Sequence, residues 1–102
     1  MVPMIESKQE ELFALCHKYN VRKLELFGSA ARGAFDPQRS DLDFLVVLGS
    51  LEPVRHSDDY FGLLFGLEGL FGCKIDLVET EAVDNPYFLK SVDRDRRVLY
   101  AA

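Results

Sequence analysis

Three aspartates are the residues of this 102-residue chain whose types and spacing could do chemistry. Asp41 and Asp43 stand one residue apart at the start of an apolar run, and residues i and i+2 of a strand project to the same face. Two carboxylates side by side either share a proton or hold a cation. Mg²⁺ suits such a pair because it prefers carboxylate oxygens and keeps waters that a phosphate can replace. The alternative is a pair of solvated aspartates at the entrance of a strand.

The third carboxylate, Asp76, lies inside the apolar sequence Lys74–Val78. A carboxylate is costly to bury without a partner, and a metal site on the neighbouring strand would supply one. Three carboxylates on two adjacent strands can hold two divalent ions, which clamp the attacking and leaving oxygens of an in-line phosphoryl displacement. Asp76 could also orient an attacking hydroxyl or accept its proton.

The sequence Gly28-Ser29 ends a predicted strand and opens a predicted short helix, which suits the binding of a phosphate. Such a junction leaves backbone N–H groups unpaired, the helix dipole favours an anion there, and glycine lets the backbone approach closely. Ser29 adds a hydroxyl donor, and Arg32, one turn later, could reach a β- or γ-phosphate. Taken singly, these residues are also consistent with a capped turn and a surface arginine.

The elements that must position these residues predict a single domain over residues 1–102, of the α/β (α+β) class, with a small mixed β-sheet flanked by helices. Helices are expected over residues 4–19, 30–33, 53–71 and 87–92, and strands over residues 21–27, 41–48 and 74–79, with an edge segment at 98–100. This is the order αβ(α)βαβα. The 41–48 run is apolar on both faces, which indicates a central strand covered on both sides.

Composition excludes several classes of function. The formal net charge of −5 argues against direct nucleic-acid binding, which needs clustered Lys and Arg. The most apolar run, residues 60–72, contains Glu68 and is shorter than the roughly 20 residues that cross a bilayer. We therefore expect no membrane association, and we expect a cytoplasmic location.

The cysteines and histidines give no sign of a metal or disulfide site. Cys16 and Cys73 are far apart in the sequence and are expected to be buried free thiols. His17 and His56 have no partner at metal-ligand spacing and are expected to be ordinary surface histidines.

In combination these motifs carry a resemblance. The order of strand, Gly-Ser turn, helix, loop, Asp-x-Asp strand, helix and Asp-bearing strand resembles the nucleotidyltransferase superfamily related to DNA polymerase beta. More narrowly, Phe27–Gly33 and Ser40–Val46 are similar to the minimal nucleotidyltransferase (MNT) family. Lys74–Val78 and Val98–Tyr100 also fit, so the resemblance covers nearly the whole chain.

The resemblance implies a role for each motif residue. Gly28 and Ser29 would hold the nucleotide triphosphate, Asp41 and Asp43 would bind Mg²⁺, and Asp76 would complete the catalytic and metal-binding triad. ATP as the substrate and a two-ion Mg²⁺ site are expectations of the same kind. Every catalytic position of the pattern is present in this sequence.

The chain has room for a catalytic core and little else. We therefore expect the hydroxyl that accepts the nucleotidyl group to come from a molecule that docks. The resemblance implies an antitoxin that transfers AMP from ATP to a tyrosine of a helical HEPN toxin, a ribonuclease. Three alternatives stay open. They are a non-catalytic antitoxin that acts by occlusion, nucleotidyl transfer to a small molecule such as an aminoglycoside, and an α/β domain whose carboxylates bind a structural metal.

The helix expected over residues 53–72 gives independent support for a partner, because its apolar residues cover more than one face: Tyr60, Phe61, Leu63, Leu64, Phe65, Leu67, Leu70 and Phe71. Gly62, Gly66 and Gly69 are poor helix formers that permit close helix approach. We expect this helix to contribute to a subunit interface, either in a homodimer or with the toxin. The alternative is that the sheet and the first helix cover it completely.

Overall fold

The computed structural model describes residues 3–31, 41–80 and 96–102. These ranges contain four helices and four strands, in this order along the chain: α1 (Pro3–Ser7), α2 (Gln9–Lys18), β1 (Val21–Phe27), α3 (Gly28–Ala31), β2 (Leu42–Leu48), α4 (Pro53–Phe71), β3 (Ile75–Glu79) and β4 (Arg97–Ala101). No helix of the described ranges is both long and apolar enough to span a bilayer.

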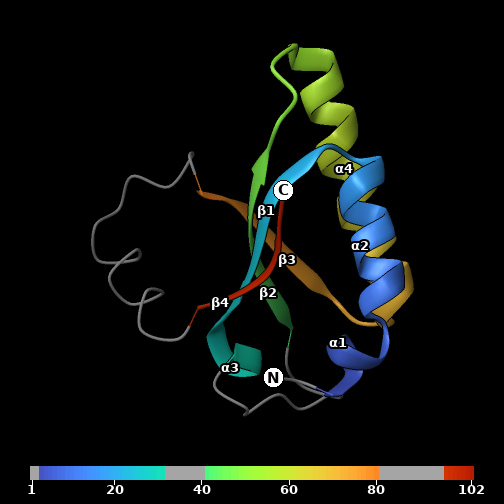
Figure 1. Cartoon of the computed structure of the whole chain (residues 1–102), viewed down its shortest axis with the longest axis vertical. Helices are drawn as coiled ribbons and strands as arrows, with labels where there is room; N and C mark the ends of the chain where they lie inside the picture. Colours follow the sequence, from blue (N-terminus) through green and yellow to red (C-terminus); the bar gives the residue numbers. More distant parts are fainter. Residues whose placement is uncertain (1–2, 32–40, 81–95) are drawn as a thin grey trace.

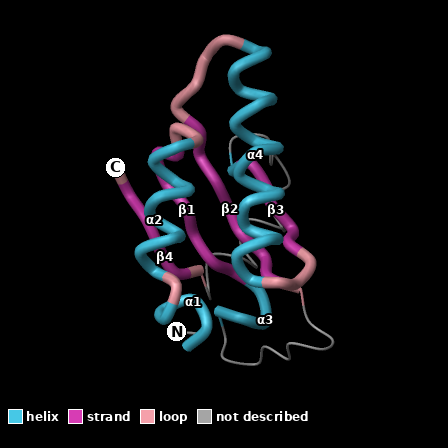
Figure 2. Tube along the Cα trace, turned by 90° about the vertical axis from the view of Figure 1, so that its right-hand side faces the viewer, coloured by secondary structure: helices cyan, strands magenta, loops and turns pink. Residues whose placement is uncertain are grey.

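The strands form one mixed sheet in the order β3-β2-β1-β4. β1 runs antiparallel to both β2 and β4, whereas β2 and β3 are parallel. A parallel pair needs a crossover connection, and α4 provides it between β2 and β3. The two long helices α2 and α4 lie side by side against one face of the sheet (Figures 1 and 2). The predicted fold class, a small mixed sheet with helices, is confirmed.

Most element predictions are also confirmed. The strand over 21–27 and the helix over 53–71 have the expected bounds, and the other two expected strands begin one residue later than predicted. The edge segment at 98–100 is part of β4. The short helix expected at 30–33 begins two residues earlier, at Gly28, while residues 32–33 and the helix expected over 87–92 lie outside the described residues.

The prediction of one continuous helix over residues 4–19 was wrong. The chain leaves the helical conformation at Lys8, which has φ −116° and ψ 24°, and this residue separates α1 from α2. The Lys8 ammonium donates to the backbone oxygen of Leu70 at 2.7 Å. A cation at the last turn of α4 satisfies a carbonyl that has no partner within the helix. The break therefore fixes the start of α2 to the end of α4.

The main core lies between the sheet and the helices. Alternate strand residues face α2 and α4 and are buried, among them Leu24, Leu26, Phe44, Val46 and Leu77. A second, smaller cluster on the opposite face contains Phe27 and Leu45, with Val78 packed against them. Phe44 and Leu45 are both at most 1% exposed, which confirms the expectation that β2 is a central strand covered on both sides.

The core contains one free cysteine, Cys16, and a second, Cys73, lies at its edge. Cys16 is fully buried, and its burial raises the pKa of the thiol to about 12. Cys73 is only half-buried, so the expectation that both cysteines would be buried holds for Cys16 alone. The pKa of Cys73 is raised by burial and then by the negative charge of Asp41. Both thiols are therefore protonated at neutral pH, as expected of small apolar side chains.

α4 has clear local signals at both ends. Glu52 precedes it and accepts hydrogen bonds from the backbone N–H groups of Val54 and Arg55, while Pro53 occupies the first helical position. Gly72 ends the helix in the left-handed conformation at φ 65°, with its N–H bonded to the Glu68 carbonyl. The expected first-turn position of Pro53 is confirmed.

Glycines set how closely α2 and α4 approach. A Cβ at Gly62 would lie 2.7 Å from Tyr19 Cζ, and one at Gly66 would lie 2.7 Å from Leu15 Cδ2, so a side chain at Gly62 would overlap a ring and one at Gly66 would require Leu15 to shift. These two glycines permit close helix packing, as predicted. A Cβ at Gly69 would meet no atom within 4 Å, so the same role is not found there.

The side of α4 that faces away from the sheet is apolar and exposed. Phe61 is 49% exposed and Phe65 is 64% exposed, and their rings stack with centroids 6.2 Å apart. The sheet and α2 therefore do not cover the whole helix, which removes the alternative that they bury it completely. Phe61 and Phe65 are called the α4 patch below.

The two kinds of glycine in α4 predict opposite effects of the same substitution. Gly69→Ala should raise the free energy of unfolding by up to about 1 kcal/mol, the gain in helix propensity, because its Cβ meets nothing. Gly62→Ala should lower it despite the same gain, because the Cβ overlaps the Tyr19 ring. Urea denaturation of both variants measures the difference, and a Gly62→Ala variant as stable as Gly69→Ala would contradict the packing described.

Candidate active site

The two halves of the sequence motif meet where β1 ends. Gly28 has a positive φ of 75°, and a Cβ placed on it would lie 3.2 Å from Cγ of Asp43 and closer still to its carboxylate oxygen. Only glycine tolerates both this backbone conformation and this contact. The carboxylate of Asp43 therefore lies directly against the glycine of the predicted phosphate-binding turn.

Strand register places the aspartates of β2 and β3 in one row. Asp43 is opposite Phe27 of β1 in the antiparallel pair and opposite Asp76 of β3 in the parallel pair. Residues paired in this way project to the same face of a sheet, so the two carboxylates are neighbours across adjacent strands. Asp76 is exposed, so the expectation that it would be buried among apolar residues was wrong. Its neighbours Ile75 and Leu77 face the helices, and Asp76 points the other way.

Asp41 lies just before β2, with its side chain 43% exposed and its carboxylate 3.8 Å from the ammonium of Lys74. The N–H of Leu42 donates to the carbonyl oxygen of Lys74 at 3.1 Å, which holds the starts of β2 and β3 together. Lys74 is itself 77% exposed, so this ion pair is well solvated and weak. Asp41 is thus partly neutralised but accessible.

These carboxylates fit the chemistry of Mg²⁺ with substrate present. Within residues 3–31, 41–80 and 96–102, no group of three or more His, Cys, Asp or Glu side chains is close enough together to hold a metal ion. Mg²⁺ in nucleotide sites is commonly held by one or two carboxylates, with phosphate oxygens and waters as the other ligands. Asp41 and Asp43 have carboxylates of the type such a site uses, and Asp43 lies against Gly28, but the predicted three-carboxylate cluster of Asp41, Asp43 and Asp76 is not found among the described residues.

For the predicted phosphate-binding residues Ser29 and Arg32, the structure describes only the backbone of Ser29. The backbone of Ser29 lies in the first turn of α3, directly after Gly28, which is where a phosphate-binding hydroxyl was expected. Arg32 lies outside the described residues.

α4 holds β3, which carries Asp76, through two side chains that sequence reasoning did not assign. The Tyr60 hydroxyl donates to the carbonyl oxygen of Leu77 at 2.6 Å. Burial, then the charges of Glu79 and Asp76, raises the pKa of Tyr60, so it remains a donor at neutral pH. His56 bonds through Nε2 to Glu79 at the end of β3. The spacing of four residues between His56 and Tyr60 places both on one face of α4, and this spacing was the available signal.

His56 is therefore not the ordinary surface histidine that was expected, whereas His17 is exposed as predicted. Nδ1 of His56 lies 3.0 Å from the carbonyl oxygen of Ser50, which can only accept, so Nδ1 carries a proton. The bond to Ser50, followed by the bond to Glu79, raises the pKa of His56. His56 thus links α4 to the loop at Ser50 and to the end of β3.

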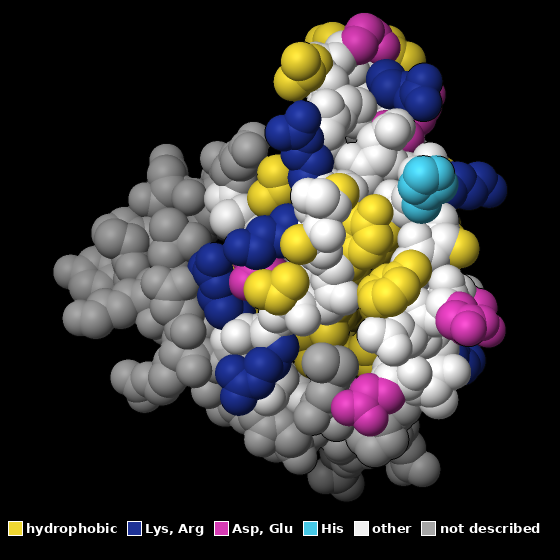
Figure 3. All heavy atoms as spheres, in the orientation of Figure 1, with side chains coloured by type: hydrophobic (Ala, Val, Ile, Leu, Met, Phe, Trp, Pro, Cys, Tyr) yellow, Lys and Arg dark blue, Asp and Glu magenta, His cyan; other side chains and the backbone are white. Residues whose placement is uncertain are grey.

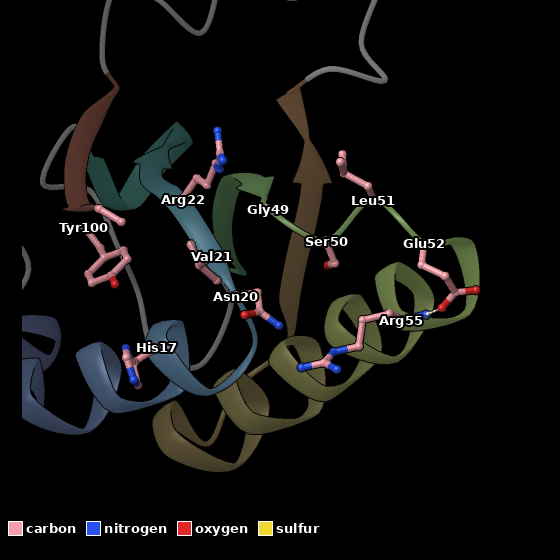
Figure 4. Close-up of a pocket in the computed structure, with 11 residues that line it drawn as sticks. His17, Asn20, Val21, Arg22, Gly49, Ser50, Leu51, Glu52, Arg55 and Tyr100 are labelled. Atoms are coloured by element: carbon pink, nitrogen blue, oxygen red, sulfur yellow. Dashed lines mark hydrogen bonds between the residues drawn. The ribbon is translucent and has the colours of Figure 1, made fainter.

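A cleft of about 530 Å³ lies at the other end of the sheet, where β1 begins and β2 ends (Figure 4). Beside it, Asp59 is 4% exposed and accepts from Asn20 at 3.0 Å and from Ser50 at 2.7 Å. Burial alone would raise the pKa of Asp59, but these hydrogen bonds and the charge of Arg55 outweigh it and lower the pKa. Among the described residues, none of the predicted site residues lines the cleft, and Asp59 bonds to Asn20 and Ser50, which do.

Comparison with known proteins identifies the family of this chain. Residues 11–99 match the family model of the nucleotidyltransferase domain. The chain is 37% identical over 78 residues, 76% of each chain, to the "Putative protein adenylyltransferase MJ1379" of Methanocaldococcus jannaschii. A solved structure described as a "putative minimal nucleotidyltransferase" superposes with a TM-score of 0.67 at 27% identity, over 95% of both chains.

A second solved structure shares the fold at lower identity. It is the complex of a tri-AMPylated HEPN toxin of Shewanella oneidensis with its MNT antitoxin. The match has a TM-score of 0.64 at 16% identity and covers 95% of this chain and 72% of that one. The family match and the identity to the archaeal relative show that this chain belongs to the nucleotidyltransferase domain family, and it is a nucleotidyltransferase of the minimal kind.

The Gly28–Asp43 contact predicts that Gly28→Ala abolishes nucleotidyl transfer and lowers the free energy of unfolding by roughly 1–3 kcal/mol, because of the positive φ and the overlap. Gly72→Ala is the matched control, since Gly72 also has a positive φ but a Cβ there would meet no atom within 4 Å. It should show a smaller stability loss and unchanged activity. Equal activity in both variants would contradict the role of the contact.

The raised pKa of His56 predicts a pH-dependent stability. A group whose pKa is higher in the folded state stabilises fully below its unfolded pKa, about 6.5 for His, and loses this contribution as the pH rises through the folded value. The melting temperatures of the wild type and His56→Gln should therefore differ most at acidic pH and converge above the folded pKa. His17→Gln, at an exposed position, should show no such trend, and a constant His56 difference at all pH values would refute the assignment.

Proposed function

We propose that this nucleotidyltransferase transfers AMP from ATP to a hydroxyl of a protein partner, a tyrosine of a cognate HEPN ribonuclease toxin, and so acts as an antitoxin. The observation that carries the proposal is the contact of Asp43 with Gly28, which joins a carboxylate donor set to a phosphate-binding turn. The archaeal relative bears the name of a protein adenylyltransferase, and the HEPN toxin in the Shewanella oneidensis complex is AMPylated, which supports this acceptor class.

The described residues suggest how the nucleotide would be bound. Its phosphates would rest against the backbone at Gly28 and Ser29, at the start of α3, where the first N–H groups of a helix have no partner within the helix. Asp41 and Asp43 would hold Mg²⁺, and Asp76 would be able to bind a second ion. The positive charge of the metal would offset the negative charge of the phosphates. Arg32 would reach a β- or γ-phosphate.

The chemical step is an in-line displacement at the α-phosphorus. The acceptor hydroxyl oxygen attacks this phosphorus, its proton passes to the carboxylate of Asp76, and the bond to the oxygen that bridges to the β-phosphate breaks. The products are an AMP ester of the partner and pyrophosphate. Asp76 suits the role of proton acceptor because it is exposed and lies beside Asp43 in the sheet.

The α4 patch gives the partner a place to dock. Phe61 and Phe65 present stacked rings on the outer side of a 19-residue helix. Exposed aromatic side chains of this kind are enriched at the centres of protein interfaces. A helical toxin is the proposed occupant, and a homodimer through the 53–72 helix is the alternative outcome.

Asp43→Asn tests the enzymatic proposal, because it keeps the size of the side chain next to Gly28 while removing its charge. Transfer from ATP to a co-expressed HEPN partner should fall roughly a hundredfold or more, the size expected for losing one electrostatic partner of the transition state. Intact mass spectrometry of the partner, with and without this chain, measures AMP addition, and neutralisation of the toxin is scored in parallel. If neutralisation persists without AMP addition, the chain acts by occlusion instead.

Phe65→Ser is the companion variant, because it alters the patch and leaves the aspartates intact. It should keep Mg²⁺-dependent ATP binding in calorimetry and lose AMP addition to the partner. If Phe65→Ser modifies the partner normally but changes the self-association of the chain in sedimentation analysis, the patch is a homodimer interface. Transfer to an aminoglycoside in place of the partner would support the small-molecule alternative.

A further inference from the structure

Glu25 is a buried carboxylate for which the catalytic scheme above has no use. It is 3% exposed and lies in the middle of β1, on the face of the sheet opposite the helices. Its Oε2 is 2.8 Å from Nε of Arg96, and its Oε1 is 3.5 Å from Nζ of Lys23. A carboxylate at this depth is stable only with such partners. The short distance makes Arg96 the main partner, with the guanidinium drawn onto the sheet face.

Register places Arg96 level with the catalytic row. Leu26 pairs with Arg97 in the antiparallel ladder of β1 and β4, so the preceding residue, Arg96, lies level with Phe27. Phe27 in turn pairs with Asp43, and Asp43 with Asp76. Four adjacent chain segments thus carry, in order, a cation, an aromatic ring and two carboxylates. Neighbouring strands are about 4.8 Å apart, so Arg96 and Asp43 lie two spacings, roughly 10 Å, from each other along the backbone.

The phosphate-binding turn lies between these opposite charges. Gly28 directly follows Phe27, the middle of the row, with Asp43 on one side and the strand of Arg96 on the other. Lys23, Glu25 and Arg96 together carry one net positive charge, and Figure 3 shows Lys and Arg side chains gathered over β1 and β4. A triphosphate on the turn would have carboxylates toward β2 and β3 and Arg96 toward β4. Lys23 precedes Gly28 by five residues on β1, about 16 Å along the strand, and so lies away from the turn.

We propose that Arg96 binds the phosphates of the nucleotide on the β4 side of Gly28, and that Glu25 is the positioning residue that fixes its guanidinium. An arginine suits this role because its planar fork binds phosphate oxygens in a fixed geometry and stays charged at all physiological pH values. Arg96 would bind the β- and γ-phosphates, the group that leaves as pyrophosphate. This inference rests on the proposed nucleotidyl transfer and adds a phosphate contact to it.

A purely structural role for the pair makes different predictions. If Arg96 only neutralises the buried Glu25, removing both charges together should leave nucleotide binding intact. If Arg96 binds phosphate, the double variant should regain stability but not affinity. Glu25→Gln separates the effect of the position of the Arg96 guanidinium from the effect of the net charge of the site. It makes the site more positive but removes the carboxylate that holds the guanidinium.

The test measures MgATP affinity by calorimetry, KM and kcat for AMP transfer, and the melting temperature of each variant. Arg96→Gln and Glu25→Gln/Arg96→Gln should both weaken ATP binding about ten- to a hundredfold, the range for a lost charge-assisted hydrogen bond. Glu25→Gln should also weaken binding, by a smaller factor, despite its added positive charge. The control Lys23→Gln makes the same charge change as Arg96→Gln at a side chain that is 41% exposed, and should bind ATP as the wild type does.

Three results would overturn the inference while leaving the proposed function standing: a double variant with wild-type affinity, equal losses in Arg96→Gln and Lys23→Gln, or tighter binding by Glu25→Gln. Should Arg96→Gln alone fail to fold, the charge-balanced double variant still decides the question. If the wild-type chain itself binds no MgATP, the proposed function fails first, and the role of Arg96 fails with it.

Discussion

The close approach of Asp43 to Gly28 is the constraint on which the site depends. It requires a residue without a side chain, in a left-handed conformation, at the end of β1, and it requires β2 to pair with β1 in one register. A shift of one residue would turn every β2 side chain to the other face and place Asp43 in the apolar core. Burial of Phe44 and Val46 against the helices therefore fixes the position of the carboxylate as well.

The helix layer supports the site from the opposite face of the sheet. α4 forms the parallel crossover that brings Asp76 beside Asp43, and Tyr60 and His56 bond it to β3. Lys8 ties the start of α2 to the last turn of α4. The same helix exposes Phe61 and Phe65 on its outer side. One element thus holds the strand of Asp76 in place and leaves an apolar surface exposed on its outer side.

Much of the fold could be predicted because its local signals are strong. Apolar runs in β1 and β2, and the Pro53 start and Gly72 end of α4, fix these elements within about a residue. The break at Lys8 could not be foreseen, because apolar periodicity continues through it and the contact that Lys8 makes there is with Leu70, 62 residues away. The exposure of Asp76 was missed because apolar neighbours on a strand do not show which face is covered.

The sequence by itself determined the residue types proposed to form the site, a glycine turn and three aspartates, and the order of elements that carries them. Residue type and spacing suffice for this, since they act over a few residues. Only the tertiary structure decided which side chains meet. Strand order placed Asp43 between Gly28 and Asp76, packing left Phe65 exposed, and the pairing of β1 with β4 brought Arg96 to Glu25. These contacts join residues distant in the chain, and long-range pairing and burial fix them.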